Sequence, residues 1–239
     1  MENADQKLLY TLPFAYMYMA VEEVGRLAEA SLHLSKSDPV MADLIADIGP
    51  CTLAKEEDYY ASLLAAIINQ QLSGSAADSI YRKLIREAGS RSDPNSIAGL
   101  SPEQFRRAGV SRSKEGFIRG LSSAFIKDGG FLKEVDQKND QEVLSILTGL
   151  NGVGTWTAHM FMIFSLNRLD ILPLGDAGFR RAVSKFYLEG RKPDDSEIIE
   201  ISKKWAPYRS IAVWYLWRGI DSAPKGPIQK RPAPAEGDL

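Results

Sequence analysis

The chain is poor in the residues that build metal centres and disulfides. It has one cysteine, Cys51, and two histidines, His33 and His159, which lie far apart in the sequence. One cysteine excludes an intrachain disulfide framework and any zinc or iron–sulfur centre held by several cysteines. We therefore expect no metal centre and no cofactor that depends on such side chains.

The chain also lacks an excess of charge of one sign and a long hydrophobic run. The formal net charge is −2 and the sequence pI is about 5.8, which argues against binding of nucleic acid through bulk basicity but allows a local basic patch. The apolar stretch 12–21 is too short to span a bilayer and leads directly into Glu22 and Glu23. We expect no targeting segment, no membrane association and a cytoplasmic location.

Convincing strand patterns are missing as well, and helical periodicity dominates the sequence. With 239 residues, 44% of them hydrophobic, the chain can bury a sizeable core. Helices are expected over residues 14–34, 38–48, 59–72, 76–88, 102–108, 114–127, 140–147, 156–164, 177–186, 194–205 and 210–218. These patterns predict an all-α fold. The proline- and glycine-rich residues 222–239 predict a disordered tail.

The most informative segment is residues 147–158, with the sequence LTGLNGVGTWTA. An amphipathic helix ends near Leu150, and a second apolar helix begins directly after two glycines that flank Val153. Gly152 and Gly154 allow positive φ and the close approach of a ligand, while Val153 can fill the space between the two helices. The N–H groups at the start of the second helix are then suited to one phosphate oxygen.

A glycine-capped turn between two helices would use many of the same residues. However, the complete string Leu-x-Gly-Val-Gly-x-x-Thr-Ala resembles the hairpin of the helix-hairpin-helix DNA glycosylase superfamily, which binds the DNA backbone without reading its sequence. The family usually has proline where this chain has Asn151. The resemblance implies a structural Na⁺ or K⁺ ion beside Leu150 and Gly152, and a DNA-binding hairpin made of Asn151, Gly152, Val153, Gly154 and Thr157.

The resemblance continues in residues 170–181, DILPLGDAGFRR, which are similar to the P-x-x-D-x-G-x-R-R stretch of 3-methyladenine DNA glycosylases. Asp176 matches the catalytic position of that family, at the start of a helix. Cleavage of an N-glycosidic bond builds positive charge on the deoxyribose, and a fixed carboxylate stabilises that charge and orients the attacking water. In the alternative interpretation Asp176 is simply a helix N-cap, and Asp170 is the nearest rival carboxylate.

Trp156 decides the expected type of reaction. Relatives that also nick the strand carry a lysine two residues beyond the last hairpin glycine, where it forms a Schiff base. Because Trp156 occupies this position, the resemblance implies hydrolysis by water and an intact abasic strand. Its ring can also stack on a cationic alkylated purine. The residues expected in the base pocket are Trp156, Trp217, His159 and Met160, whereas Trp205 and Trp214 are expected in the core.

Residues 67–77, IINQQLSGSAA, interrupt an apolar helix with two amides. They resemble the family motif QQ-[IL]-S-x-x-A-A, whose second glutamine enters the duplex where a base has been flipped out; here that residue is Gln71, flanked by Gln70 and Leu72. Such a wedge offsets part of the cost of base extrusion, and simple helix capping is the alternative. Further candidate phosphate contacts are Ser73 and, in a corner resembling G-x-S-x-x-K, Ser111 and Lys114.

The resemblance extends from about residue 37 to residue 217 and relates the chain to shorter, all-helical members of the family. It implies a helical extension (1–35), a glycosylase core of two helical lobes flanking a cleft (36–221) and the tail (222–239). The expected protein is a monomeric, monofunctional enzyme that excises alkylated bases, such as 3-methyladenine and 7-methylguanine, from double-stranded DNA. It would act at the nucleoid of a prokaryote or in a nucleus.

Three alternatives remain open at this stage. One is a glycosylase for uracil, hypoxanthine or a mismatched base, because the choice of base depends on pocket contacts that a sequence does not reveal. Another is a non-catalytic helix-hairpin-helix protein that binds DNA. The third is a helical interaction domain that binds no nucleic acid.

Overall fold

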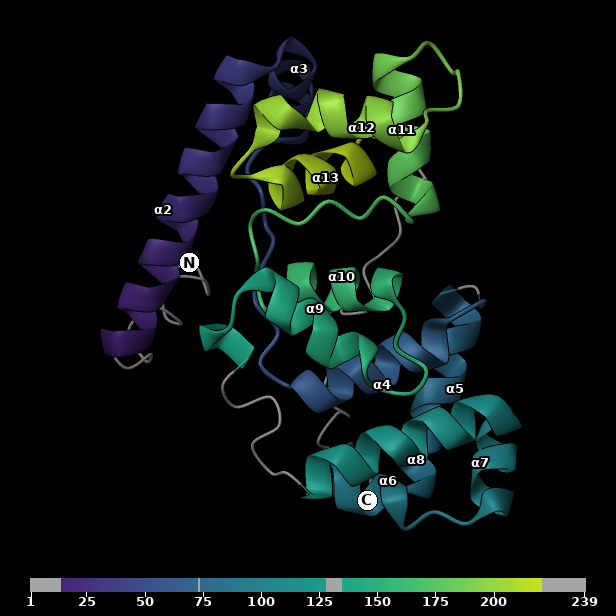
Figure 1. Cartoon of the computed structure of the whole chain (residues 1–239). Helices are drawn as coiled ribbons and strands as arrows, with labels where there is room; N and C mark the ends of the chain where they lie inside the picture. The colour runs from purple at the N-terminus through teal and green to yellow at the C-terminus, as the bar shows by residue number, and fades with distance from the viewer. Residues whose placement is uncertain (1–13, 73, 128–134, 221–239) are drawn as a thin grey trace, which may run out of the picture. The chain divides into compact units, whose positions relative to one another are not determined.

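The computed structural model describes residues 14–72, 74–127 and 135–220 (Figure 1). All regular secondary structure in these ranges is helical, which confirms the predicted all-α class. Within the same ranges, no helix is both long enough and apolar enough to cross a membrane. The predicted tail 222–239 and Ser73 lie outside the described residues.

The described residues divide into two compact units. The first unit comprises residues 14–53 and 179–220, and the second comprises residues 54–178. The helices of the first unit are α2 (Phe14–Ser37), α3 (Pro39–Ile48), most of α11 (Ala177–Tyr187), α12 (Asp195–Ser202), the short 3₁₀ helix η2 (Lys203–Trp205) and α13 (Arg209–Arg218).

Helix α13 forms the centre of the first unit, where it packs against α2 and α3. Every residue from Ser210 to Trp217 is buried, as expected of a helix that is apolar on all sides. Trp205 and Trp214 have exposed fractions of 0% and 6%, which confirms their prediction as core residues. Arg180 pairs with Asp195 and donates to the Pro193 carbonyl over 2.7 Å, so its described partners are structural.

Asp38 joins three segments of the first unit. It is fully buried, and its side chain caps α3 by accepting a hydrogen bond from the Val40 N–H over 3.0 Å. The same carboxylate accepts hydrogen bonds from the Tyr187 hydroxyl over 2.6 Å and from the Trp205 indole over 2.7 Å. Lys204 adds an ion pair at 3.1 Å. Asp38 is therefore a structural centre that the sequence shows only as a helix-start signal.

The second unit contains α4 (Tyr59–Asn69), α5 (Gly74–Glu87), α6 (Pro94–Ala98), α7 (Pro102–Ala108), α8 (Arg112–Lys127), the 3₁₀ helix η1 (Val135–Gln137), α9 (Asp140–Thr148) and α10 (Thr155–Phe164). Helix α4 is central, since it packs against α5, α8 and α10 (Figure 1). Asp58 caps its first turn, and every residue from Tyr60 to Ile68 except Ala61 is buried.

Two predictions of element boundaries are wrong in this unit. The helix expected over 59–72 ends at Asn69, so the two glutamines that follow lie outside it. Residues 94–98 are absent from the expected helices but form α6, whose Asp93 cap and first-turn proline begin a helix too short to show periodicity. The helix start predicted at residue 102 is confirmed, and Ser101 and Gln104 form a capping box at α7.

Candidate active site

The hairpin (residues 150–154) connects α9 to α10 within the second unit. Helix α9 ends at Thr148, and the turn closes through a hydrogen bond of 3.0 Å from the Val153 N–H to the Leu150 carbonyl. Val153 is 4% exposed, so its side chain is packed inward as expected. The turn therefore presents backbone atoms and the exposed Asn151 to its surroundings.

The two hairpin glycines have different roles. Gly152 has φ +86°, and a Cβ atom there would lie 2.3 Å from Cγ of Phe117, so both the conformation and the space require glycine. Gly154 has φ −85° and ψ 172°, and a Cβ atom there would meet nothing within 4 Å. The prediction of a positive φ at Gly154 is therefore wrong. No motif in the sequence pointed to Phe117, which lies on α8.

Gly154 is instead the N-cap of α10, and it offers no side chain to the first turn. The N–H groups at the start of a helix have no partner inside the helix. Because Gly154 has no side chain to cap them, they are suited to an acceptor from another molecule, and the helix dipole favours an anion at this end.

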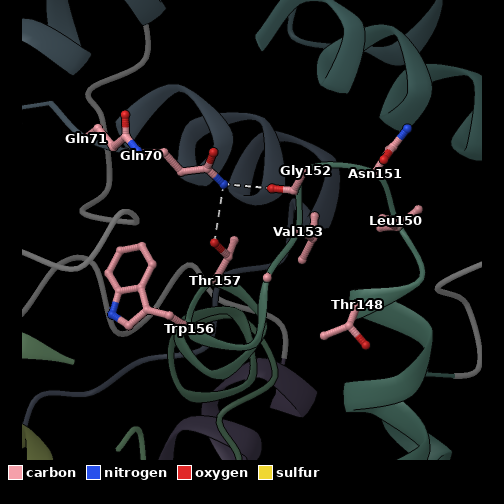
Figure 2. A pocket seen from close by; sticks show the side chains of 10 residues that line it. Gln70, Gln71, Thr148, Leu150, Asn151, Gly152, Val153, Trp156 and Thr157 are labelled. Atoms are coloured by element: carbon pink, nitrogen blue, oxygen red, sulfur yellow. Dashed lines mark hydrogen bonds between the residues drawn. The ribbon is translucent and has the colours of Figure 1, made fainter. Parts of the chain in front are cut away.

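A hollow of about 590 Å³ adjoins the hairpin (Figure 2). It is lined by backbone and side chains of residues 150–154 and by Trp156 and Thr157 on the first turn of α10. The corner after α4 contributes Gln70 and Gln71. The structure thus brings the predicted DNA-binding hairpin and the predicted wedge to one hollow, although they are distant in the sequence.

The predicted catalytic carboxylate lies next to a predicted base-pocket residue. The Trp156 indole N–H donates a hydrogen bond to Oδ2 of Asp176 over 2.8 Å. Asp176 is 4% exposed and stands immediately before α11, and its own N–H donates to the Pro173 carbonyl over 2.9 Å. Its position at a helix start is as predicted. A buried carboxylate with one oxygen oriented by an indole is suited to stabilising a nearby positive charge.

The other residues predicted for the base pocket have more varied surroundings. His159 on α10 is partly buried, and burial lowers the pKa of its imidazole below the ordinary value, which favours the neutral ring at neutral pH. Met160 is 1% exposed and packs in the core of the second unit. Trp217 lies on α13 in the first unit and is 2% exposed. The assignment of these residues to a base pocket stays a prediction.

The residues predicted to form the wedge differ in exposure and in partners. Gln71 and Leu72 are exposed, whereas the Gln70 side-chain amide donates to the Gly152 carbonyl over 2.7 Å and contacts the Thr157 hydroxyl at 3.4 Å (Figure 2). Thr157 is 2% exposed, so its hydroxyl is shielded from solvent. The sequence did not predict this connection between Gln70 and the hairpin.

The candidate phosphate contacts outside the hairpin serve helix ends. Lys114 donates from Nζ to the carbonyls of Ile68 and Gln70 over 2.8 and 2.7 Å, and so caps the end of α4. The Ser111 hydroxyl accepts from the Lys114 N–H at 3.4 Å, at the start of α8. The Ser111 contact is that of a helix start, whereas the partly buried Lys114 ammonium group is bonded to the end of another helix. A role of either residue in binding phosphate stays a prediction.

Among the described residues, no group of three or more His, Cys, Asp or Glu side chains could hold a metal ion. For the monovalent cation expected at the hairpin, the Leu150 carbonyl already accepts from the Val153 N–H and the Gly152 carbonyl from Gln70. A cation would have to use the second lone pair of each oxygen. Its presence stays a prediction.

Comparison with known proteins assigns the chain to a family. The model of the HhH-GPD superfamily base excision DNA repair protein matches residues 64–207, a range that includes the corner after α4, the hairpin, Trp156 and Asp176. The chain belongs to this superfamily. The resemblance drawn from the hairpin and from the segment around Asp176 is thereby confirmed.

Several members of the superfamily are similar over most of the chain. An alkylbase DNA glycosidase-like protein of Schizosaccharomyces pombe is 31% identical over 195 residues, which cover 79% of this chain and 92% of that protein. The crystal structure of a DNA-3-methyladenine glycosidase from Bacillus halodurans has 34% identity and a TM-score of 0.69, covering 78% of this chain and 86% of that one. The 3-methyladenine DNA glycosylase of S. pombe in complex with abasic DNA has 28% identity and a TM-score of 0.71, covering 81% of this chain and 98% of that one.

Proposed function

We propose that this HhH-GPD protein is a monofunctional DNA glycosylase that releases alkylated purines, of the 3-methyladenine and 7-methylguanine type, from double-stranded DNA in base excision repair. The observation that carries the proposal is the hydrogen bond from Trp156 to Asp176, because it holds a buried carboxylate beside the first turn of α10, directly after the hairpin. The names of the relatives support the substrate class, since they are an alkylbase DNA glycosidase-like protein, a DNA-3-methyladenine glycosidase and a 3-methyladenine DNA glycosylase.

In the proposed mechanism the hairpin binds the DNA backbone and Asp176 faces the sugar of the flipped nucleotide. As the N-glycosidic bond breaks, the deoxyribose gains positive charge, which the carboxylate stabilises. The burial of Asp176 strengthens this attraction, because little water screens the charge. An alkylated purine is already cationic and leaves without a strong protein acid.

The reaction ends with hydrolysis. Trp156 stands where strand-cutting relatives carry a lysine, and an indole cannot form a Schiff base with the sugar. Water is therefore the nucleophile, and Asp176 is placed to orient it. The expected product is an abasic strand without a nick, and we propose that the enzyme acts as a monomer.

One test of this function measures base release from alkylated, deaminated and oxidised duplexes. We expect release of 3-methyladenine and 7-methylguanine, with no strand cleavage before alkaline treatment. Release of uracil or hypoxanthine alone would replace the proposed substrate class. Strand cleavage by the purified enzyme would contradict the assignment of water as the nucleophile.

A matched pair of variants separates catalysis from DNA binding alone. Asp176→Asn keeps the shape of the side chain and should lower the single-turnover rate by about 100-fold or more while DNA binding persists. Asp170→Asn, at the rival carboxylate, should leave the rate within about threefold. If the wild type binds DNA and releases no base from any duplex, the chain is a non-catalytic DNA-binding member of the superfamily.

A further inference from the structure

The corner that follows α4 has a conformation that requires support. Gln70 is extended, with φ −54° and ψ 128°, and Gln71 then turns with φ +58°. A residue other than glycine rarely adopts this left-handed backbone conformation, and it keeps the conformation when neighbouring contacts fix the backbone. A hydrogen bond of 3.2 Å from the Leu72 N–H to the Asn69 carbonyl closes the turn, and because the side chains of Gln71 and Leu72 are exposed, Gln70 is the residue of the turn that can tie it to other elements.

Gln70 supplies this support through two different groups. Its backbone carbonyl accepts a hydrogen bond from Nζ of Lys114 on α8 over 2.7 Å. Its side-chain amide donates to the Gly152 carbonyl in the hairpin over 2.7 Å (Figure 2). The residue immediately before the exposed Gln71 is thus fixed both to α8 and to the hairpin, and all of these elements belong to one unit.

The contacts of Lys114 show that the support is built into the fold. Its ammonium group also donates to the Ile68 carbonyl over 2.8 Å, so two of its three hydrogens are used at the end of α4. Partial burial lowers the pKa of Lys114, and no carboxylate among the described residues offsets this effect. The cation lies where the helix dipole favours it.

We propose that Gln70 is a positioning residue that fixes the exposed Gln71 corner relative to the hairpin. Gln71 then enters the duplex at a constant distance from the point where the hairpin binds the DNA backbone. The proposal rests on the proposed function. A wedge that enters the duplex while the hairpin holds the phosphates must keep its distance from the hairpin, since small displacements of positioned groups cause large losses of rate. In this role Gln70 does not itself enter the DNA.

The test compares two substrates that differ in the cost of base extrusion. In one duplex 7-methylguanine is paired with cytosine, and in the other it lies opposite an abasic-site analogue, where no base pair must be broken. Gln70→Ala should lower the single-turnover rate about 3- to 10-fold on the paired lesion, the effect of one lost hydrogen bond. On the unpaired lesion the rate should change less than about twofold.

Gln104→Ala serves as the matched control. Gln104 also uses its side-chain amide inside the second unit, where it donates to the Glu87 carbonyl over 3.2 Å and accepts from the Ser101 N–H over 2.9 Å. Its removal should cause a similar loss of thermal stability without changing the ratio of the two rates. If Gln104→Ala changes that ratio as much as Gln70→Ala does, general destabilisation explains the effect and the proposal is overturned.

A double variant identifies the residue that enters the DNA. If Gln70 acts through Gln71, the pair Gln70→Ala and Gln71→Ala should be no slower on the paired lesion than Gln71→Ala alone. If the two single losses of rate multiply in the double variant, Gln70 enters the duplex itself and the proposal is overturned. Equal losses on both substrates would do so as well. Failure of the proposed function is distinct, because the wild type would then release no 7-methylguanine from either duplex.

Discussion

The indole N–H of Trp156 and Oδ2 of Asp176 form a hydrogen bond of 2.8 Å between the first turn of α10 and the residue before α11. The aromatic ring of Trp156 and the carboxylate of Asp176, which were predicted separately, are therefore bonded to each other. Trp156→Phe keeps an aromatic face but removes the donor. Because a hydrogen bond to a charged group contributes roughly 1.5–3 kcal/mol, we expect the single-turnover rate on 7-methylguanine DNA to fall about 10- to 150-fold.

The dissociation constant for the same DNA should change less than about threefold, since the backbone contacts proposed for the hairpin are unaffected. Trp214→Phe, in the core of the first unit, controls for the general cost of replacing an indole. An unchanged rate in Trp156→Phe would show that stacking accounts for the contribution of Trp156. The orientation of Asp176 would then depend on other contacts.

The hairpin glycines provide a second prediction with a built-in control. Gly152→Ala must tolerate φ +86° and a Cβ atom 2.3 Å from the Phe117 ring, so we expect a loss of roughly 2–5 kcal/mol in the free energy of unfolding. In a chain of this size that corresponds to a decrease in Tm of about 5–15 °C.

Gly154→Ala has an ordinary φ and open space, so its Tm should lie within about 2 °C of the wild type. Its DNA binding should nevertheless weaken, because the added methyl group lies beside the N–H groups that are proposed to meet a phosphate. Differential scanning fluorimetry and DNA titrations measure both effects. Equal Tm values for the two variants would contradict the different roles of these glycines.

The motifs were enough to predict where the hairpin, Trp156 and Asp176 lie along the helices. Each lies at a helix boundary with strong local signals, and their separation in the sequence matches that of the family motifs. They did not reveal the hydrogen bond between Trp156 and Asp176, since the direction of an indole depends on how the loop between α10 and α11 folds back. The same limit applies to Phe117, whose contact with Gly152 joins segments distant in the sequence.

The pair Gln70 and Gln71 shows the limit most clearly. Both belong to one motif, and periodicity extends the helix through them, so the sequence assigns both to the wedge. The structure ends α4 at Asn69 and turns the backbone at Gln71, which sends one amide to the hairpin and leaves the other residue exposed. Tertiary contacts, and above all the Lys114 cap on the Ile68 and Gln70 carbonyls, decide this difference.

Cys51 should be unreactive in the native protein. It is 8% exposed, and burial raises the pKa of its thiol to about 11. At about pH 8 roughly one thiol in a thousand is then ionised, and the thiolate is the reactive form. We expect reaction with a chromogenic disulfide reagent to take hours in native buffer and seconds to minutes in denaturant. Complete labelling of the native protein within minutes would contradict the buried position of this thiol.

The buried contacts of Asp38 predict how the free energy of unfolding of the first unit depends on pH. Burial alone would raise the pKa of Asp38, but the hydrogen bonds from Tyr187, Trp205 and Lys204 outweigh that effect and hold the pKa below its ordinary value of 3.8. A carboxyl group with a lowered folded-state pKa stabilises the fold above its unfolded-state pKa. This contribution is lost as the pH falls through the folded-state value. Asp38→Asn should therefore lower the free energy of unfolding by roughly 3–5 kcal/mol at about pH 7, because buried donors lose a charged partner.

The difference between the wild type and Asp38→Asn should shrink as the pH is lowered below about 4, where Asp38 of the unfolded chain begins to be protonated, and continue to shrink until the pH falls below the lower folded-state pKa. Urea unfolding followed by tryptophan fluorescence measures this, since Trp205 donates to Asp38 directly. Asp194→Asn, at the exposed cap of α12, is the control and should cost about 1 kcal/mol or less. A difference between wild type and Asp38→Asn that stays constant from neutral to acid pH would mean that the charge of Asp38 does not stabilise this unit, and that its capping geometry alone does.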